Sequence, residues 1–210
     1  MRFAKQSFQR ILMPILLALA LLTTMSDAGA SDTDAAAKRR DAEQMVLVIV
    51  PQWTSTQGTL RTYARDGKHK PWHEVGHARP VVIGNAGAGW GWGLNPPQHD
   101  GPMKREGDGR SPAGVFAIGN AFGYAAHVQT ALDYAQMQVT SYCVDVSGSR
   151  YYNRIVDAAK VGAAAVKGAS EHMRLDLHNH GDPRYRRGFV IEHNAEGAPM
   201  GGSCIFAHLW

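Results

Sequence analysis

Two cysteines and ten histidines are the side chains of this 210-residue sequence best suited to nucleophilic or metal chemistry. Cys143 and Cys204 could form a disulfide, or they could be small buried apolar residues. His178 and His180 form a His-x-His pair, which in a strand would face one side and could share a zinc ion. The residues between and after them are typical of a turn, and no second histidine motif completes a site. We therefore expect surface histidines here, with no metal and no cofactor.

A glycine-rich segment between residues 84 and 112 raises a second possibility, a phosphate-binding loop. Such a loop must open a helix whose N-terminal amides face the phosphates, whereas Trp92, Gly93 and two prolines follow here. Nucleotide binding is therefore not expected. Irregular segments of this length are uncommon and are often functional. The segment could line a substrate groove, or Trp90 and Trp92 could simply pack on a sheet edge.

The elements that must position these residues are mostly strands. Six short apolar runs bounded by turn residues predict strands; they cover residues 45–50, 79–83, 114–118, 142–146, 188–193 and 203–208. Helical signals are fewer, at residues 151–165 and, for a turn or two, at 129–137. We predict a mainly β domain with one or two helices, built as a sandwich of packed sheets.

The first thirty residues differ from this domain. Three basic residues precede the apolar stretch 11–22, and Ala28-Gly29-Ala30 provides the small-x-small pattern of a cleavage site. We predict a signal peptide over residues 1–30, a tether over 31–44 and one domain over 45–210. The apolar stretch is shorter than the roughly 20 residues that span a bilayer. We expect an exported protein of the periplasm or cell-wall space, without stable membrane insertion after signal cleavage.

The net charge bears on which partners the protein binds, and export bears on the redox state of its cysteines. The formal net charge is +4, and the leader holds three basic residues and one acidic residue, which leaves 19 − 17 = +2 for residues 31–210. The tight basic groups, at residues 38–40 and 184–187, are typical of solvated loops, so no nucleic-acid partner is expected. Because thiols outside the cytoplasm meet oxidising conditions, a Cys143–Cys204 disulfide is expected.

The stretch from Lys104 to Phe116 is a charged, glycine-broken loop that enters a strand through a Ser-Pro-x-Gly turn. It resembles the entry motif of the L,D-transpeptidase catalytic domain, the YkuD-like or ErfK/YbiS-like family. The resemblance covers roughly residues 45–210. Further matching motifs follow in order: Ala121–Tyr124, Cys143–Asp145, Ser149–Asn153, Ser170–Met173, His193-Asn194 and Gly202–His208.

The resemblance implies acyl transfer between peptidoglycan stem peptides through a cysteine thioester, with a histidine that raises the thiolate fraction. His208 matches the family's general base. The family's cysteine follows in a Thr/Ser-x-Gly-Cys turn, which this sequence lacks. Cys204 would lie about 13 Å from His208 along a strand, whereas a nucleophile and its base lie within about 3 Å. Cys143 matches a strand of the family and is a weaker candidate.

Three interpretations of the missing cysteine follow, in this order. The first is a transpeptidase domain that is truncated before its nucleophile and so incomplete at its C-terminal end. The second is a catalytically inactive peptidoglycan-binding protein, and the third is an enzyme that recruits Cys143 or Cys204. A zinc-dependent cell-wall peptidase is a minor alternative. Each of the first three has peptidoglycan stem peptides as the partner.

Overall fold

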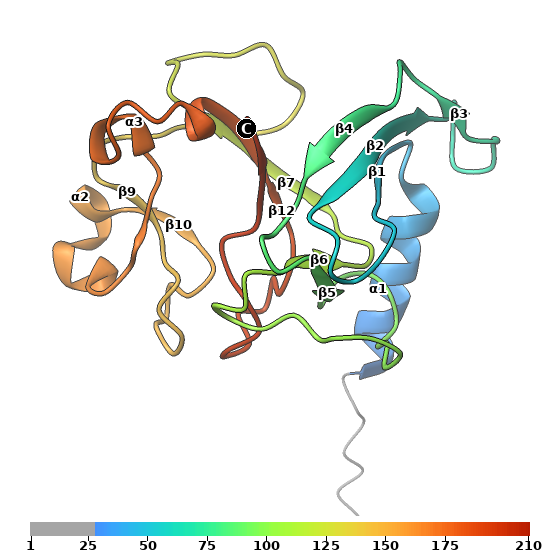
Figure 1. The fold of residues 1–210 in the computed structure, drawn as a ribbon, viewed down its shortest axis with the longest axis horizontal. Coiled ribbons are helices and arrows are strands. Elements are labelled where there is room, and N and C mark those ends of the chain that lie inside the picture. Colours follow the sequence, from blue (N-terminus) through green and yellow to red (C-terminus); the bar gives the residue numbers. More distant parts are fainter. Residues whose placement is uncertain (1–27) are drawn as a thin grey trace, which may run out of the picture.

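The computed structural model of the protein describes residues 28–210, so nearly all of the predicted signal peptide lies outside the described residues. Residues 28–210 contain thirteen strands and three α-helices, with about 29% of the described structure in strands against 13% in helices. The mainly β prediction is therefore confirmed (Figure 1). Within the same residues, no helix is both long enough and apolar enough to cross a membrane.

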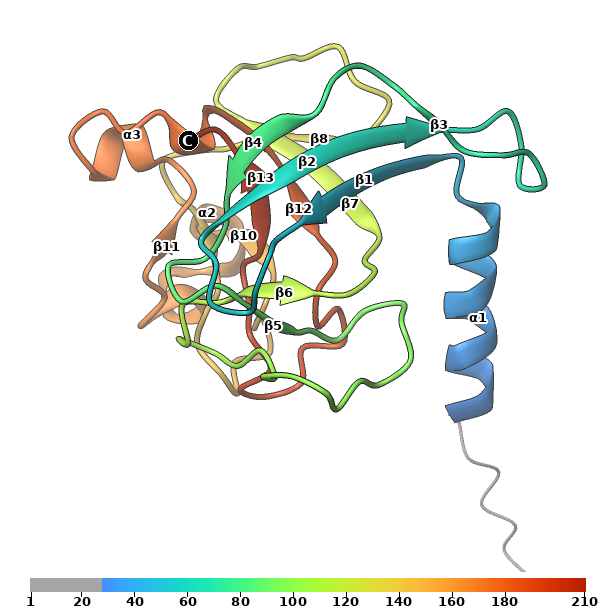
Figure 2. The ribbon, with the colours of Figure 1, turned by 45° about the vertical axis from the view of Figure 1, so that its right-hand side comes forward.

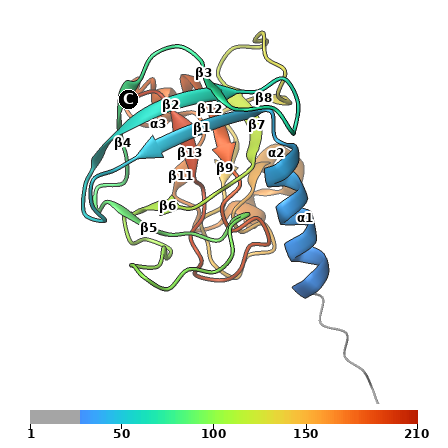
Figure 3. The same ribbon diagram turned by 90° about the vertical axis from the view of Figure 1, so that its right-hand side faces the viewer.

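Helix α1 (Ala28–Asp41) occupies most of the predicted tether and includes the predicted cleavage site. Alanines favour a helix there, Lys38 pairs with Asp34 one turn earlier at 2.8 Å, and basic residues in the last turn complement the helix dipole. The helix projects away from the strands at the start of β1 (Figures 2 and 3). It has no apolar face, which is why apolar periodicity did not predict it.

The first sheet is formed by the N-terminal strands around β2 (Gln57–Ala64). Strand β1 (Gln44–Ile49) runs antiparallel along the whole of β2, while β3 (His73–Glu74) and β4 (Arg79–Val82) pair with its two ends. Pro51 follows β1 and cannot donate to a ladder. Every residue of these four strands keeps some solvent exposure, so this sheet has no fully buried side chain.

Three further sheets carry the rest of the domain. One has the order β13-β12-β7-β8, and its strands are β7 (Ile118–Gly123), β8 (Tyr134–Gln136), β12 (Arg187–Ile191) and β13 (Phe206–His208). Another has the order β10-β9-β11, and its strands are β9 (Ser141–Cys143), β10 (Ile155–Asp157) and β11 (Glu171–His172). Strands β5 (Ala88–Trp90) and β6 (Ser111–Ala113) form a parallel pair.

Short helices connect the C-terminal strands: α2 (Ala158–Val161), α3 (Leu175–His178) and the 3₁₀ helices Ala163–Val166 and Arg184–Arg186. The main apolar cluster comprises Phe122, Met137, Cys143, Met173 and Tyr185. Its members come from the β9 and β12 sheets and their connections, and none comes from the first sheet. The buried centre of the domain therefore lies in its C-terminal half.

Two predicted strands are shorter than expected because of backbone conformation. Residues 203–205 are irregular, and Cys204 has φ 56°, a left-handed conformation that interrupts a strand. Residues 114–117 are also irregular, and the first of them, Gly114, has φ 137°. Ile118 begins the strand instead. The strands predicted at 45–50, 79–83 and 188–193 are present with small changes at their ends, and that at 142–146 continues only to Cys143.

The predicted helical turn over residues 129–137 is wrong. Residues 134–136 form β8, which pairs in parallel with residues 121–123 of β7, so strand pairing overrode the local pattern. The helical region predicted over 151–165 begins with a turn at residues 151–153 and continues with β10. Only then do α2 and a 3₁₀ helix follow, separated by Gly162 at φ 88°.

Candidate functional site

His208 lies at the exposed end of β13, opposite Gly188 of β12. Its Nδ1 is 2.6 Å from the carbonyl oxygen of Leu209. Because a carbonyl oxygen can only accept, this contact places the ring proton on Nδ1. When the ring is neutral, Nε2 carries the lone pair, and no group among residues 28–210 hydrogen-bonds to it. In a neutral ring this arrangement leaves Nε2 as the acceptor nitrogen, which is what a general base needs, and the residue as a whole is exposed.

Tyr185 supports the His208 ring from the protein side. The ring centroids are 5.1 Å apart and the ring planes are 74° apart, an edge-to-face contact. Tyr185 is only 8% exposed, and burial together with the nearby Glu171 carboxyl raises the pKa of its hydroxyl. The N–H of Leu209 also donates to the Arg184 carbonyl at 3.2 Å. The 3₁₀ helix that carries Tyr185 therefore holds the segment that carries His208.

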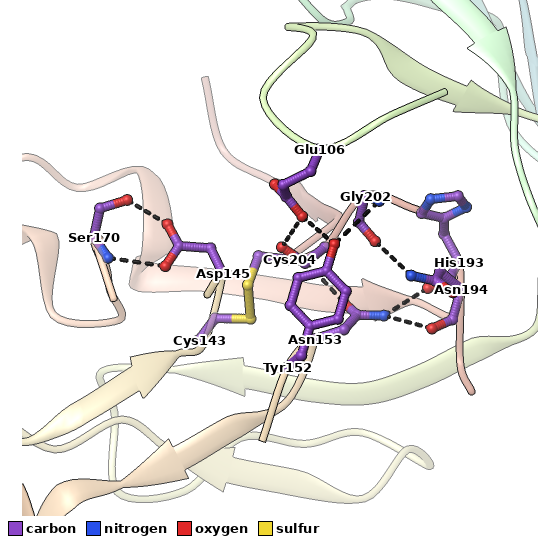
Figure 4. Close-up of a disulfide and its surroundings, with 11 residues drawn as sticks. Glu106, Cys143, Asp145, Tyr152, Asn153, Ser170, His193, Asn194, Gly202 and Cys204 are labelled. Atoms are coloured by element: carbon purple, nitrogen blue, oxygen red, sulfur yellow. Dashed lines mark hydrogen bonds between the residues drawn. A yellow bond between two sulfur atoms is a disulfide. The ribbon is translucent and has the colours of Figure 1, made fainter. Parts of the chain in front are cut away.

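The two cysteines are joined to each other. The Cys143–Cys204 disulfide has an S–S distance of 2.06 Å and closes a sequence separation of 61 residues. The residues 28–210 thus contain no free thiol. The Cys204 N–H donates to Asn153 Oδ1 at 2.8 Å, and both residues have positive φ, 56° and 61° (Figure 4). While this bond is intact, neither cysteine can act as a nucleophile.

A buried polar group surrounds the residues just before Cys204. Glu106 Oε2 accepts the Ser203 hydroxyl at 2.7 Å and also accepts the Tyr152 hydroxyl, and the Gly202 N–H donates to the Tyr152 oxygen at 3.2 Å (Figure 4). Burial and the Glu106 carboxylate together raise the pKa of Tyr152 to about 12. Tyr152 is therefore a neutral donor at physiological pH. These bonds connect the loop after β5 to the segment that leads into β13.

The charged loop of residues 104–109 is organised around one ion pair. Lys104 is 6% exposed, and its Nζ lies 2.6 Å from Asp108 Oδ1. Burial opposes the ionisation of Asp108, but hydrogen bonds from Lys104 and from the N–H groups of Arg110 and Arg105 lower its pKa overall. Gly107 and Gly109 adopt φ of 69° and 68°, which glycine allows at no steric cost. The motif thus forms a satisfied structural turn.

His193 is a structural histidine. Its Nδ1 accepts the Trp92 N–H at 3.2 Å and its Nε2 donates to the Gly201 carbonyl at 2.9 Å, so both ring nitrogens are satisfied in the neutral form. Burial lowers its pKa. Asn153 Nδ2 donates to the carbonyls of His193 and Asn194, at 2.8 and 2.9 Å. This group joins the β12 end to the segment before Cys204.

The His-x-His pair does not form a shared site. His178 ends α3, and its ring stacks on His172 with 4.0 Å between centroids and 26° between planes. His180 lies in the turn that follows, at φ 50°. In the described part of the chain, no three His, Cys, Asp or Glu side chains are grouped as a metal site would require. His172 Nδ1 is buried without a hydrogen-bond partner there.

The candidate residues fall into two groups at opposite ends of the β12-β13 pair. His208 lies opposite Gly188 at one end, while His193, just beyond β12, lies beside the segment of Gly201 and Cys204 at the other. Sequence reasoning did not identify Tyr185 as a neighbour of His208, and nothing in its local sequence indicates that contact. No family model, curated protein or solved structure matches the chain.

Proposed function

We propose that this domain is an L,D-transpeptidase-like sandwich that binds peptidoglycan stem peptides, with His208 at the position of the family's general base. The observation that carries the proposal is the state of His208: it is exposed, its Nδ1 proton is used by the Leu209 carbonyl, and its Nε2 is free. Tyr185 fixes the plane of the ring. An imidazole in this state can take a proton from a thiol or an amine nucleophile.

The motif resemblance supplies the substrate class. The motifs from Lys104 to His208 resemble those of enzymes that act on stem peptides, and His208 stands at the position of the family's histidine. An exported protein with an expected address in the cell-wall space would meet peptidoglycan directly. The substrate class thus rests on the sequence, whereas the role of His208 also rests on its contacts.

The thiol is the part of the chemistry that residues 28–210 do not provide. Both cysteines of the sequence are in the disulfide. In a cysteine acyl transfer, the thiolate attacks the peptide carbonyl, the terminal D-amino acid leaves as an amine, and a second amine takes the acyl group. We propose that the oxidised domain binds the donor stem and performs no acyl transfer with its own thiols. The catalytically inactive, peptidoglycan-binding interpretation applies to this oxidised form.

The test separates binding from chemistry. The oxidised protein should sediment with purified peptidoglycan. A disaccharide tetrapeptide should shift the side-chain NMR signals of His208 and leave those of the exposed His77 unchanged. Mass spectrometry should detect no release of the terminal D-residue. Absence of sedimentation together with unchanged His208 signals would overturn the binding proposal, and D-residue release by the oxidised protein would overturn the statement about its thiols.

A further inference from the structure

Backbone hydrogen bonds hold the segment that follows β5 against the segment at the end of β6. The Gly91 N–H donates to the Ala113 carbonyl at 2.8 Å, and the Leu94 N–H donates to the Val115 carbonyl at 2.6 Å. The segment between them, Gly91-Trp92-Gly93, therefore continues alongside the chain after β6. It has one side chain larger than hydrogen, the indole of Trp92.

Both backbone polar groups of Trp92 are hydrogen-bonded. Its N–H donates to His193 Nδ1 at 3.2 Å, and its carbonyl accepts the Asn194 N–H at 2.8 Å. Both partners are almost fully buried, at 1% and 2% exposure. The main chain of Trp92 is thus connected to the buried interior rather than to a mobile loop.

The two flanking glycines press this segment against the protein. A Cβ on Gly91 would lie 2.6 Å from Pro112 Cβ, and one on Gly93 would lie 2.3 Å from the Val115 carbonyl oxygen. No other residue type fits at either position without movement of the backbone. Gly91 is buried, whereas Trp92 and Gly93 are exposed, and 47% of Trp92 is accessible to solvent.

Trp90, two residues earlier, differs from Trp92 in both its packing and its indole hydrogen bond. Its ring packs on Trp53 at 5.2 Å between centroids, and its Nε1–H donates to Asp100 Oδ1 at 2.8 Å. The Nε1–H of Trp92 has no acceptor among residues 28–210. Of the two tryptophans, Trp90 packs on its neighbours, and Trp92 is half exposed with an indole N–H that has no acceptor among residues 28–210.

The two paired segments that carry Trp92 and follow β6 have no charged side chain of their own; the Glu192 carboxylate lies against Gly119 of the second segment. Residues 91–98 and 111–126, which include the two paired segments, contain no Asp, Glu, Lys or Arg. They contain instead Asn95, Gln98 and the half-exposed Val115. A charged ligand would find no counter-ion on these segments, whereas a neutral ligand with apolar C–H faces and hydroxyl groups matches an indole with a free N–H.

From these observations we infer that the indole of Trp92 is a stacking platform for one pyranose ring of a neutral, N-acetylated glycan. The apolar face of the sugar lies on the indole, and the Nε1–H donates to a hydroxyl or acetamido oxygen. The identity of the glycan rests on the proposed peptidoglycan function; the platform itself rests on the geometry of residues 91–94. The strand-like pairing of that segment holds the indole in place before the ligand arrives, which lowers the ordering cost of binding.

The test uses the full oxidised protein labelled with 5-fluorotryptophan, so that each of its five tryptophans gives a fluorine NMR signal. The probe is the tetramer of N-acetylglucosamine, and a sugar-free stem tetrapeptide is titrated separately. The tetramer should shift the Trp92 signal to saturation. It should leave the Trp210 signal unchanged, although Trp210 is 84% exposed.

Two variants complete the design. Trp92→Ala should weaken tetramer binding about tenfold, the loss of roughly one aromatic stacking contact, while the matched Trp210→Ala leaves it unchanged; the remaining fluorine signals report that each variant is folded. Equal shifts of Trp92 and Trp210, no shift with the tetramer, or unaltered affinity in Trp92→Ala would each overturn the platform. If the tetrapeptide perturbs His208 while the tetramer leaves Trp92 unchanged, the platform fails and the proposed function stands. The reverse result supports the platform and contradicts the binding of the stem peptide at His208.

Discussion

The ring of Tyr185 meets the imidazole of His208 edge to face, with 5.1 Å between centroids. Tyr185 also makes edge-to-face contacts with Phe122, at 5.8 Å, and with Phe206, at 5.5 Å. The exposed histidine is thus the outermost ring of a group that reaches into the main apolar cluster. This contact restrains the ring of an exposed side chain in addition to its Nδ1 hydrogen bond with Leu209.

Replacing Tyr185 should therefore affect both stability and the order of His208. Tyr185→Leu should lower the free energy of unfolding by about 1–3 kcal/mol, because a buried aromatic ring is lost, and should increase side-chain disorder of His208 in NMR relaxation. Tyr185→Phe keeps the ring and serves as the matched control, with a cost of about 1 kcal/mol for the lost hydroxyl interaction. Equal disorder of His208 in both variants would contradict the supporting role of the ring.

Glu106→Gln tests the polar group before Cys204. Oε2 of Glu106 accepts two hydroxyls, from Tyr152 and Ser203. An amide oxygen could accept both, but as a neutral acceptor it makes weaker hydrogen bonds than a carboxylate, and its NH₂ group adds donors to a part-buried site. We expect a loss of about 1–3 kcal/mol in the free energy of unfolding, measured by urea denaturation. The exposed Glu196→Gln is the control, with a change within about 0.5 kcal/mol. A loss of the same size in both variants would mean that the network contributes nothing of its own.

The disulfide should be a main contributor to stability. A cross-link that closes 61 residues restricts the unfolded chain by about 4 kcal/mol in the chain-entropy account, and measured values are often about 2–4 kcal/mol. The double variant Cys143→Ala/Cys204→Ala should unfold at correspondingly lower urea concentration. Quantitative labelling of the unreduced, denatured protein should find no thiol, and two labelled thiols would disprove the pairing.

Stability should decrease as the pH falls from about 7 to about 5. Burial lowers the pKa of His193, and burial together with His178 lowers that of His172. A histidine whose pKa is lower in the folded protein takes up a proton more readily when unfolded. The stability present above the unfolded pKa of about 6.5 is therefore lost as the pH falls toward the folded pKa.

The Glu171 carboxyl acts in the opposite direction, because burial raises its pKa. The measurement is therefore made in a Glu171→Gln background, by urea denaturation at the two pH values. Adding His172→Phe, which keeps a ring against Tyr142 and His178, should reduce the pH dependence and leave the part due to His193. A free energy of unfolding that is constant or rises on acidification in this background would refute the assignment.

The local pattern of apolar and β-branched residues predicted strands correctly where a single segment favours extended backbone by its own composition. The run at 45–50 and the run at 188–193 are strands because consecutive β-branched and apolar residues favour extended backbone. The pattern was misleading at 129–137, where pairing with β7 decides the conformation. The pattern gave no indication of α1, because this helix depends on its alanine content and an i,i+4 ion pair rather than on apolar periodicity.

The candidate site divides in the same way. The sequence by itself determined the mainly β class, the residue types at His208 and in the Lys104–Asp108 turn, and the presence of only two cysteines. Only the tertiary structure decided that Tyr185 supports His208, that Glu106 binds the segment before Cys204, and that Trp90 is packed while Trp92 is exposed. The physical reason is the separation in sequence. Backbone preference and apolar periodicity depend on residues that are close together in the sequence. These contacts instead join segments tens of residues apart, which meet only when the whole domain is packed.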